Sequence, residues 1–278
     1  MLTVLGDSLV GSSAAGHGFT LRRLALPLAS ACLYSAGMAL NDYADRKLDA
    51  QERPERPIPS GRITPSQALV AASSLTVAGL ALAAGAGGRS TFRLALPLAG
   101  CIWIYDLVAK PHAIAGPLFM GACRSIDVLM GAGTDRATAA IVPAAVLGAH
   151  TVGVTVLARG EVNGTTRAIA SGVAGSTALL CSAISWWSTR QEPRRYEAFF
   201  ALAFFLSRCL PAQLRTAHTP SATNALEATR SGIRAMVPLQ AALSLRHGNI
   251  GAGLALGIVD LAGKAMRSRR NVRKISES

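Results

Sequence analysis

The stretch ALNDYADRKLDAQERPERPIPSGR, Ala39–Arg62, puts a cluster of carboxylates directly after one apolar block, Leu24–Leu40, and just before another, Ala68–Gly85. These are two of ten apolar blocks, several of which approach the roughly 20 residues that a helix needs to cross a bilayer. Short connections containing Gly and Pro separate the blocks. The sequence therefore predicts an all-α, polytopic membrane bundle with about nine or ten transmembrane helices. The other eight blocks are Leu2–Gly16, Phe92–Val108, Ala113–Ala132, Ala137–Ala158, Ala168–Trp187, Ala198–Leu214, Ala228–Leu245 and Ile250–Ala265.

The composition supports this class. Half of the 278 residues are hydrophobic and only 15% are charged. A net charge of +13 is compatible with nucleic-acid binding, but in a membrane protein it indicates the excess of Lys and Arg in cytoplasmic loops. The basic loop after Leu40 and the tail KAMRSRRNVRK are thus predicted to be cytoplasmic, although the loop STRQEPRR argues the other way. No nucleic-acid or protein partner is inferred.

No polar linker is long enough to separate two domains, so residues 1–278 are expected to form one membrane domain. The five cysteines lie within or beside apolar blocks and include no CxxC pair, which favours reduced packing cysteines over a metal or disulfide framework.

The carboxylates of the opening stretch have the spacing of a binding site. If the preceding helix continues one or two turns beyond the bilayer, Asn41, Asp45 and Asp49 fall at i, i+4 and i+8 on one face, with Asp42 beside them. Clustered carboxylates repel one another unless a cation binds, and hard oxygen ligands suit Mg²⁺, which commonly bridges to phosphate. The alternative is that these residues are merely solvated at the membrane surface.

The following RPERPIPSGR favours the binding site, because its arginines offer forked donors that match phosphate oxygens. Arg53, Arg56 and Arg62 are therefore candidate ligands for a diphosphate.

NDYADRKLD followed by RPERPIPSGR resembles the first aspartate-rich motif, NDxxDxxxD with a trailing RPxxxG, of the UbiA superfamily of intramembrane prenyltransferases. The resemblance implies a helical bundle of that type, which uses Mg²⁺ to transfer a prenyl group from a prenyl diphosphate to an aromatic or other small-molecule acceptor beside membrane lipid. It implies metal ligation by Asn41, Asp45 and Asp49 and catalytic roles for Asp42, Asp45 and Asp49. RPIPSGR, GEVNG and GIRAMVPLQAAL together are similar to a bacterial branch, the EboC-like prenyltransferases. A bacterial inner (cell) membrane is therefore the expected location.

The second motif departs from the family. At the foot of the sixth helix the family has two or three spaced Asp, whereas this chain has Glu161 with Asn163, Arg159 and Arg167. Glu161 is a candidate either to complete the metal site or to deprotonate the acceptor.

The passage IYDLVAKPHAIAGPLFMGACRSIDVLMGA resembles the family's fourth-to-fifth helix region through Tyr105, Lys110, Arg124 and Asp127, which become candidate substrate-binding residues. Lys110, two crossings after the first motif, is expected at the same membrane face. Independently of any family, Arg124 and Asp127 lie well inside an apolar segment and can meet at i, i+3, and intramembrane charges indicate function. Asp106 either lines the mouth of the cavity or is solvated.

Three other functions remain open. A UbiA-like protein with an eroded second motif could bind, or help export, a lipid or prenylated metabolite without catalysis. A secondary transporter also carries intramembrane charges, but no inverted repeat is evident. A CDP-alcohol phosphotransferase clusters Asp in membrane helices too, but its DG and AR elements are missing here.

Overall fold

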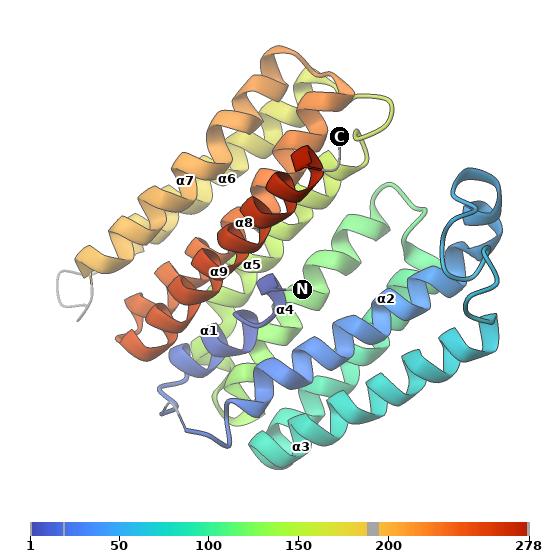
Figure 1. The fold of residues 1–278 in the computed structure, drawn as a ribbon. Coiled ribbons are helices and arrows are strands. Elements are labelled where there is room, and N and C mark those ends of the chain that lie inside the picture. Colours follow the sequence, from blue (N-terminus) through green and yellow to red (C-terminus); the bar gives the residue numbers. More distant parts are fainter. Residues whose placement is uncertain (1, 19, 188–194, 277–278) are drawn as a thin grey trace. The chain divides into compact units, whose positions relative to one another are not determined.

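The computed structural model describes residues 2–18, 20–187 and 195–276 (Figure 1). Within them the chain forms nine α-helices and no β-strand, which confirms the all-α prediction. Each predicted apolar block coincides with a helix or with one half of a helix. The helices are α1 (Asp7–Ala14), α2 (Ala25–Glu52), α3 (Pro65–Ile104), α4 (Ala115–Ala132), α5 (Ala137–Ala158), α6 (Arg167–Trp187), α7 (Arg195–His218), α8 (Ala222–Arg246) and α9 (Ile250–Ser276), with single turns η1 (Leu2–Val4), η2 (Tyr105–Ala109) and η3 (Thr134–Arg136).

Four described segments are long and apolar enough to cross a membrane, by length and composition. One of them combines α3 with η2, one combines η3 with α5, and the other two lie within α6 and α7. The four segments are Pro65–Ala109, Thr134–Ala158, Arg167–Trp186 and Tyr196–His218.

Contacts divide the chain into two compact units, of which the first comprises Thr3–Thr155 and the second begins at Val156. The first unit holds α1 to α4 and nearly all of α5, and the second holds α6 to α9. The expectation of a single domain over 1–278 stays a prediction.

Helix α3 consists of two segments that reverse direction at Gly88, which adopts φ 68° and ψ −155°. Arg22 Nε, before α2, donates a hydrogen bond to the Gly85 carbonyl at 2.8 Å. Lys110, after α3, instead contacts the far end of α2 through Asn41. The first segment of α3 therefore runs antiparallel to α2 and the second returns beside it. The two separate blocks predicted from the sequence are thus two helical segments, joined by a residue whose positive φ favours glycine.

The core of the first unit forms where α2, both segments of α3 and α4 meet. Small side chains let the helices approach closely, and larger ones fill the remaining space. The α3 capping box, in which Thr64 and Gln67 bond each other's backbone N–H groups, fixes the start of the first segment. The buried cluster comprises Ala29, Leu33, Ala83, Ala95, Leu98, Ala99, Cys101, Ile102, Cys123 and Met130.

Helix α1 packs closely on α4. A Cβ built on Gly131 would lie 2.1 Å from the Ser8 carbonyl oxygen, and one built on Gly11 would lie 1.7 Å from that of Val128. The Ser12 hydroxyl donates to the Gly131 carbonyl at 2.9 Å. This contact leaves no room for side chains, so glycine is required at both positions.

The second unit has its own hydrophobic core and its own polar contacts between elements. The loop after α5 is bonded to the α7–α8 turn, because the Thr165 N–H donates to the Pro220 carbonyl at 3.1 Å. Arg208 of α7 donates to both carboxylate oxygens of Asp260 of α9, each at 2.8 Å. The core comprises Leu157, Ala170, Val173, Ala212, Ala217 and Ala228.

Candidate functional site

The C-terminal turns of α2 carry the first motif. The helix continues to Glu52, as the spacing argument required, so Asn41, Asp42, Asp45 and Asp49 all lie on α2. The Lys110 ammonium donates to Asn41 Oδ1 at 2.6 Å and also pairs with Asp45 Oδ2. Since one cation contacts both side chains, Asn41 and Asp45 share a helix face, as predicted. Lys110 also meets the first motif at the same end of α2, as the crossing count predicted.

A π-helical turn, η2, places Lys110 there. The Lys110 N–H donates to the Tyr105 carbonyl, five residues earlier, at 2.9 Å. Such turns insert one extra residue into a helix and often lie at functional sites. Here the turn allows Tyr105 and Asp106 to line a pocket while Lys110 reaches α2.

The loop Arg53–Arg62, called the arginine loop below, closes over the same end of α2. Arg56 donates to Asp42 Oδ1 at 3.0 Å, with both side chains about one-third exposed. Arg62 holds the loop's own shape by donating to the Glu55 carbonyl at 2.6 Å and to the Ser60 hydroxyl at 3.0 Å. Arg56 thus lies at the carboxylates of the first motif, as the diphosphate hypothesis expects. Arg62 stabilises the conformation of the arginine loop.

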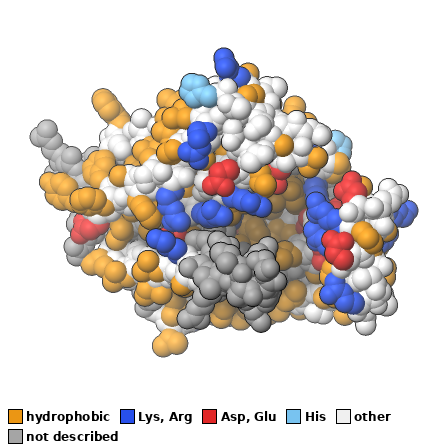
Figure 2. Space-filling view, turned by 45° about the horizontal axis from the view of Figure 1, so that its top comes forward, with side chains coloured by type: hydrophobic (Ala, Val, Ile, Leu, Met, Phe, Trp, Pro, Cys, Tyr) orange, Lys and Arg blue, Asp and Glu red, His pale blue; other side chains and the backbone are white. Residues whose placement is uncertain are grey.

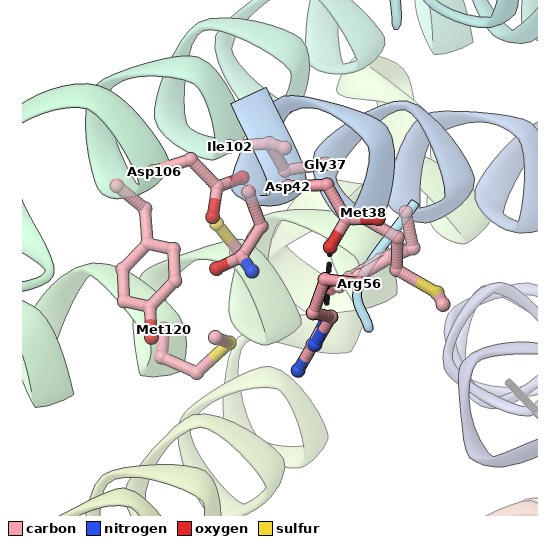
Figure 3. Close-up of a pocket in the computed structure, with 11 residues that line it drawn as sticks. Gly37, Met38, Asp42, Arg56, Ile102, Asp106 and Met120 are labelled. Atoms are coloured by element: carbon pink, nitrogen blue, oxygen red, sulfur yellow. Dashed lines mark hydrogen bonds and ion pairs between the residues drawn. The ribbon is translucent and has the colours of Figure 1, made fainter. Parts of the chain in front are cut away.

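A cavity of about 350 Å³ opens between α2, α3, η2 and α4 (Figure 3). One part of its wall is polar, where Asn41, Asp42 and Arg56 meet, and another is apolar, with Ile102 and Met120. The pocket therefore offers a polar contact for a charged group beside an apolar surface. Its remaining lining residues are Tyr34, Gly37, Met38, Tyr105, Asp106 and Cys123.

A second cavity, of about 400 Å³, lies between α2, the arginine loop and the start of α3. Asp42 lines both cavities, and Arg62 lines this one. The Asp42–Arg56 pair is thus the contact at which the arginine loop, α2 and the first pocket meet.

Charged side chains on the face drawn in Figure 2 occur in mixed groups, with acidic ones next to basic ones. The pairs Arg56–Asp42 and Lys110–Asp45 show the same mixing in detail.

The other predicted residues of the first motif differ in exposure. Asp49 is buried, with 6% of the residue exposed. Arg53 is exposed and ends α2, where its N–H donates to the Asp49 carbonyl at 2.8 Å. Neither residue lines the first cavity.

Arg124 and Asp127 lie behind the pocket wall. The ion pair of Arg124 is with Asp7 of α1, and its guanidinium also donates to the Thr3 carbonyl and hydroxyl, both at 3.0 Å. The Arg124 guanidinium carbon lies 5.4 Å from the ring centre of Tyr34, which lines the pocket. Asp127 Oδ1 accepts a hydrogen bond from Ser30 at 2.6 Å.

Arg124 is not one of the residues that line the pocket, but its guanidinium lies near the ring of Tyr34, which does. Its ion pair is with Asp7 of α1 and not with Asp127 at i+3, which helical spacing allowed. Sequence reasoning missed Asp7. The available signal was a lone carboxylate inside the first apolar block. The sequence also did not decide whether Asp106 lines a cavity or is solvated. The structure places this residue in the pocket wall with only 8% exposed.

Glu161, with which the second motif begins, belongs to the second unit, in the turn after α5. Its N–H donates to the Ala158 carbonyl at 3.1 Å. The pocket of the first unit is thus formed without it.

The side chains around Lys110 have the donor chemistry of a divalent-cation site. Among the described residues no group of three or more His, Cys, Asp or Glu side chains is placed to hold a metal ion. However, the oxygens of Asn41 and Asp45 converge on one cation. One or two protein ligands suffice for Mg²⁺ when water and substrate phosphate complete its shell. Asn41 and Asp45 therefore fit Mg²⁺ when a diphosphate is bound with it.

Comparison with protein-family models matches more than half of this chain to one family. The sequence profile described as the UbiA prenyltransferase family matches residues 8–163. Among curated relatives, the digeranylgeranylglyceryl phosphate synthase of Methanothrix thermoacetophila is 41% identical over 95 residues, which are 34% of this chain and 35% of that protein. The mitochondrial 4-hydroxybenzoate polyprenyltransferase of Saccharomyces cerevisiae is 37% identical over 108 residues, or 34% of this chain and 26% of that protein. The match thus spans about a third or less of the length of these relatives.

Two solved structures show the same fold across most of the chain. A UbiA homolog from Aeropyrum pernix K1 superposes with a TM-score of 0.65 at 15% identity, covering 87% of this chain and 95% of the other. A digeranylgeranylglyceryl phosphate synthase structure gives a TM-score of 0.56 at 16% identity, covering 88% and 92%. These matches confirm the predicted UbiA-type bundle, while the EboC-like branch stays a prediction.

Proposed function

Because this chain belongs to the UbiA prenyltransferase family, we propose that it transfers a prenyl group from a prenyl diphosphate to a small-molecule acceptor in the membrane. The observation that carries the proposal is the first pocket. Its polar wall, with Asn41, Asp42 and Arg56, adjoins an apolar wall with Ile102 and Met120. A prenyl diphosphate has the same two-part chemistry, an anionic head on an apolar chain.

The diphosphate head is proposed to bind where the two cations lie. Arg56 and Lys110 now pair with Asp42 and Asp45, so each cation is already oriented toward the motif. Cations held in place before the reaction stabilise the negative charge that develops on the leaving diphosphate without further reorganisation. Arg53, Arg62 and Tyr105 are proposed to assist at this end.

Asn41 and Asp45, with Asp49 at the next turn of the same helix, are proposed to hold Mg²⁺. When bound, Mg²⁺ would neutralise part of the diphosphate charge and so favour cleavage of the bond to the prenyl carbon. Asp42, Asp45 and Asp49 are the proposed catalytic carboxylates of the first motif. Glu161 remains the proposed counterpart from the second motif.

The prenyl chain is proposed to lie against the apolar wall. Ile102 and Met120 expose only hydrocarbon and thioether to the cavity. Exclusion of water by such a wall protects a reactive allylic cation from hydrolysis.

The names of the relatives indicate two kinds of acceptor, an isoprenoid glyceryl phosphate lipid and 4-hydroxybenzoate. We propose an acceptor from one of these classes, used by a protein of the cell membrane with its motif loops in the cytoplasm.

The test measures pyrophosphate release by the full-length protein in detergent. The assay contains Mg²⁺, geranylgeranyl diphosphate and, in turn, 4-hydroxybenzoate or a geranylgeranylglyceryl phosphate. Asp45→Asn should lower release about 10²- to 10³-fold, the effect of removing one preorganised electrostatic group. The matched control is Glu52→Gln, an exposed carboxylate at the end of the same helix.

Equal release by Asp45→Asn and wild type would refute the assigned site. Wild-type protein that binds prenyl diphosphate but releases no pyrophosphate with either acceptor would favour the non-catalytic binding protein.

A further inference from the structure

We propose that Asp106 binds the acceptor by accepting a hydrogen bond from its hydroxyl group, so that the pocket selects hydroxyl-bearing acceptors. The inference rests on the proposed prenyl transfer and adds a specificity-determining residue to it. Neither the first motif nor the arginine loop contains this residue.

The wall of the pocket is shaped around the Asp106 carboxyl. Opposite it, α2 has Gly37, where a Cβ would lie 3.2 Å from Asp106 Oδ2 and 2.8 Å from Ile102 Cγ2. Any larger residue at position 37 would therefore crowd both side chains. The missing side chain leaves space for the Asp106 carboxyl beside the α2 backbone.

The Asp106 carboxyl has no partner within the described part of the chain. The residue is 8% exposed and lines the pocket, yet its carboxyl makes no hydrogen bond or ion pair with any described residue. The nearby cations pair with other residues, Lys110 with Asn41 and Asp45 and Arg56 with Asp42. Figure 3 shows Asp106 across the pocket from the Asp42–Arg56 pair.

The Asp106 carboxyl opens onto the cavity, so a bound ligand can supply the hydrogen bond that no described residue supplies. The structure therefore places an unused hydrogen-bond acceptor inside the cavity, next to the polar wall proposed for the diphosphate.

Charge and chemistry narrow the choice of ligand group. The proposed diphosphate site has a cation paired with each carboxylate, Arg56 with Asp42 and Lys110 with Asp45, whereas Asp106 has no such pair among the described residues. A prenyl chain has no donor to offer. The proposed Mg²⁺ ligands, Asn41 and Asp45, both contact Lys110, whereas no ion pair joins Asp106 to Lys110 among the described residues. An ammonium group would be repelled by Lys110 and Arg56. A neutral hydroxyl group on the acceptor meets all of these conditions.

The test uses a matched pair of probes small enough for the pocket. 4-Fluorophenol donates a hydrogen bond, whereas 4-fluoroanisole has nearly the same shape and donates none. Binding of each is followed by ¹⁹F NMR with full-length protein in detergent. The proteins are wild type, Asp106→Asn, Asp106→Leu and the control Asp135→Asn, which alters an exposed carboxylate outside the pocket. Partition of the probes into micelles is common to all four proteins and cancels on comparison.

Wild type and Asp135→Asn should bind the phenol more tightly than the anisole. Asp106→Leu removes the acceptor and should lose about tenfold in phenol affinity, whereas Asp106→Asn, whose amide oxygen can still accept a hydrogen bond, should lose less. Anisole affinity should be unchanged in both variants. Unchanged anisole binding also shows that the pocket is still folded.

Equal phenol affinity in wild type and both Asp106 variants would overturn the inference, as would a wild type that does not prefer phenol over anisole. An altered Mg²⁺ requirement in Asp106→Asn without a change in phenol binding would overturn it in favour of a metal ligand.

The two proposals fail separately. If the wild type transfers no prenyl group but shows the Asp106-dependent preference for phenol, only the proposed reaction is lost. If it transfers prenyl groups, Asp106→Leu should raise the KM for 4-hydroxybenzoate about tenfold and leave the KM for prenyl diphosphate unchanged. An unchanged KM for an accepted hydroxyl substrate would refute the inference alone.

Discussion

Replacing Asp7 by Asn should destabilise the first unit strongly, because it removes the ion-pair partner of a buried arginine. The side chains of Arg124 and Asp7 are only 9% and 1% exposed. Removing one member of a buried pair leaves an uncompensated charge and typically costs about 3–5 kcal/mol. The amide that replaces the carboxylate and the two contacts with Thr3 remain as partial compensation. We therefore expect the lower end, about 3 kcal/mol, or a change of roughly 150-fold in the unfolding equilibrium.

Equilibrium unfolding in mixed detergent and SDS micelles would measure this effect. The double variant Asp7→Leu with Arg124→Met removes both members of the ion pair and should be less destabilised than either single variant, because neither member is left without the other. Asp135→Asn, which alters an exposed carboxylate, serves as the control. A loss below about 1 kcal/mol for Asp7→Asn, the range of exposed pairs, would refute the view that this pair is buried and coupled.

Three further perturbations test separate parts of the structure. Gly88 has a φ of 68°, so Gly88→Ala should lower the unfolding free energy by about 1 kcal/mol or more. Gly85 has open space around it and no positive φ, so Gly85→Ala should be tolerated in the same assay. Lys110→Met removes the cation shared by two oxygens of α2, so kcat/KM for prenyl diphosphate should fall about 10²-fold, and an unchanged value would remove Lys110 from the site. Burial, together with two nearby arginines, lowers the pKa of His17 from 6.5. The neutral His17 side chain therefore contributes fully to stability above pH 6.5, and this contribution declines as the pH falls below that value. The unfolding free energy of His17→Gln should depend less on pH between pH 7.5 and 5.5 than that of the wild type.

Much of the fold is predictable from the sequence, because a bilayer leaves few choices. A chain in hydrocarbon must satisfy every backbone group internally, so apolar blocks of sufficient length become helices. Every predicted block matches a helix or half of one, and the break between Gly85 and Phe92 falls at Gly88, where φ is positive. The periodicity of a helix likewise brings Asn41 and Asp45 to one face, and the number of crossings brings Lys110 to the same end of the bundle.

Tertiary structure decided which side chains meet across helices. Helical spacing allowed Arg124 to pair with Asp127 on α4, but the close approach of α1 at Gly11 and Gly131 brings Asp7 to Arg124 instead. The environment of Asp106 was equally open, because a residue at the foot of a helix faces water or a cavity according to the rotation of that helix. The π-helical turn and the missing side chain at Gly37 decide that rotation in favour of the pocket. A sequence specifies the faces of each helix through its period, whereas the partner of each face depends on packing between segments far apart in the chain.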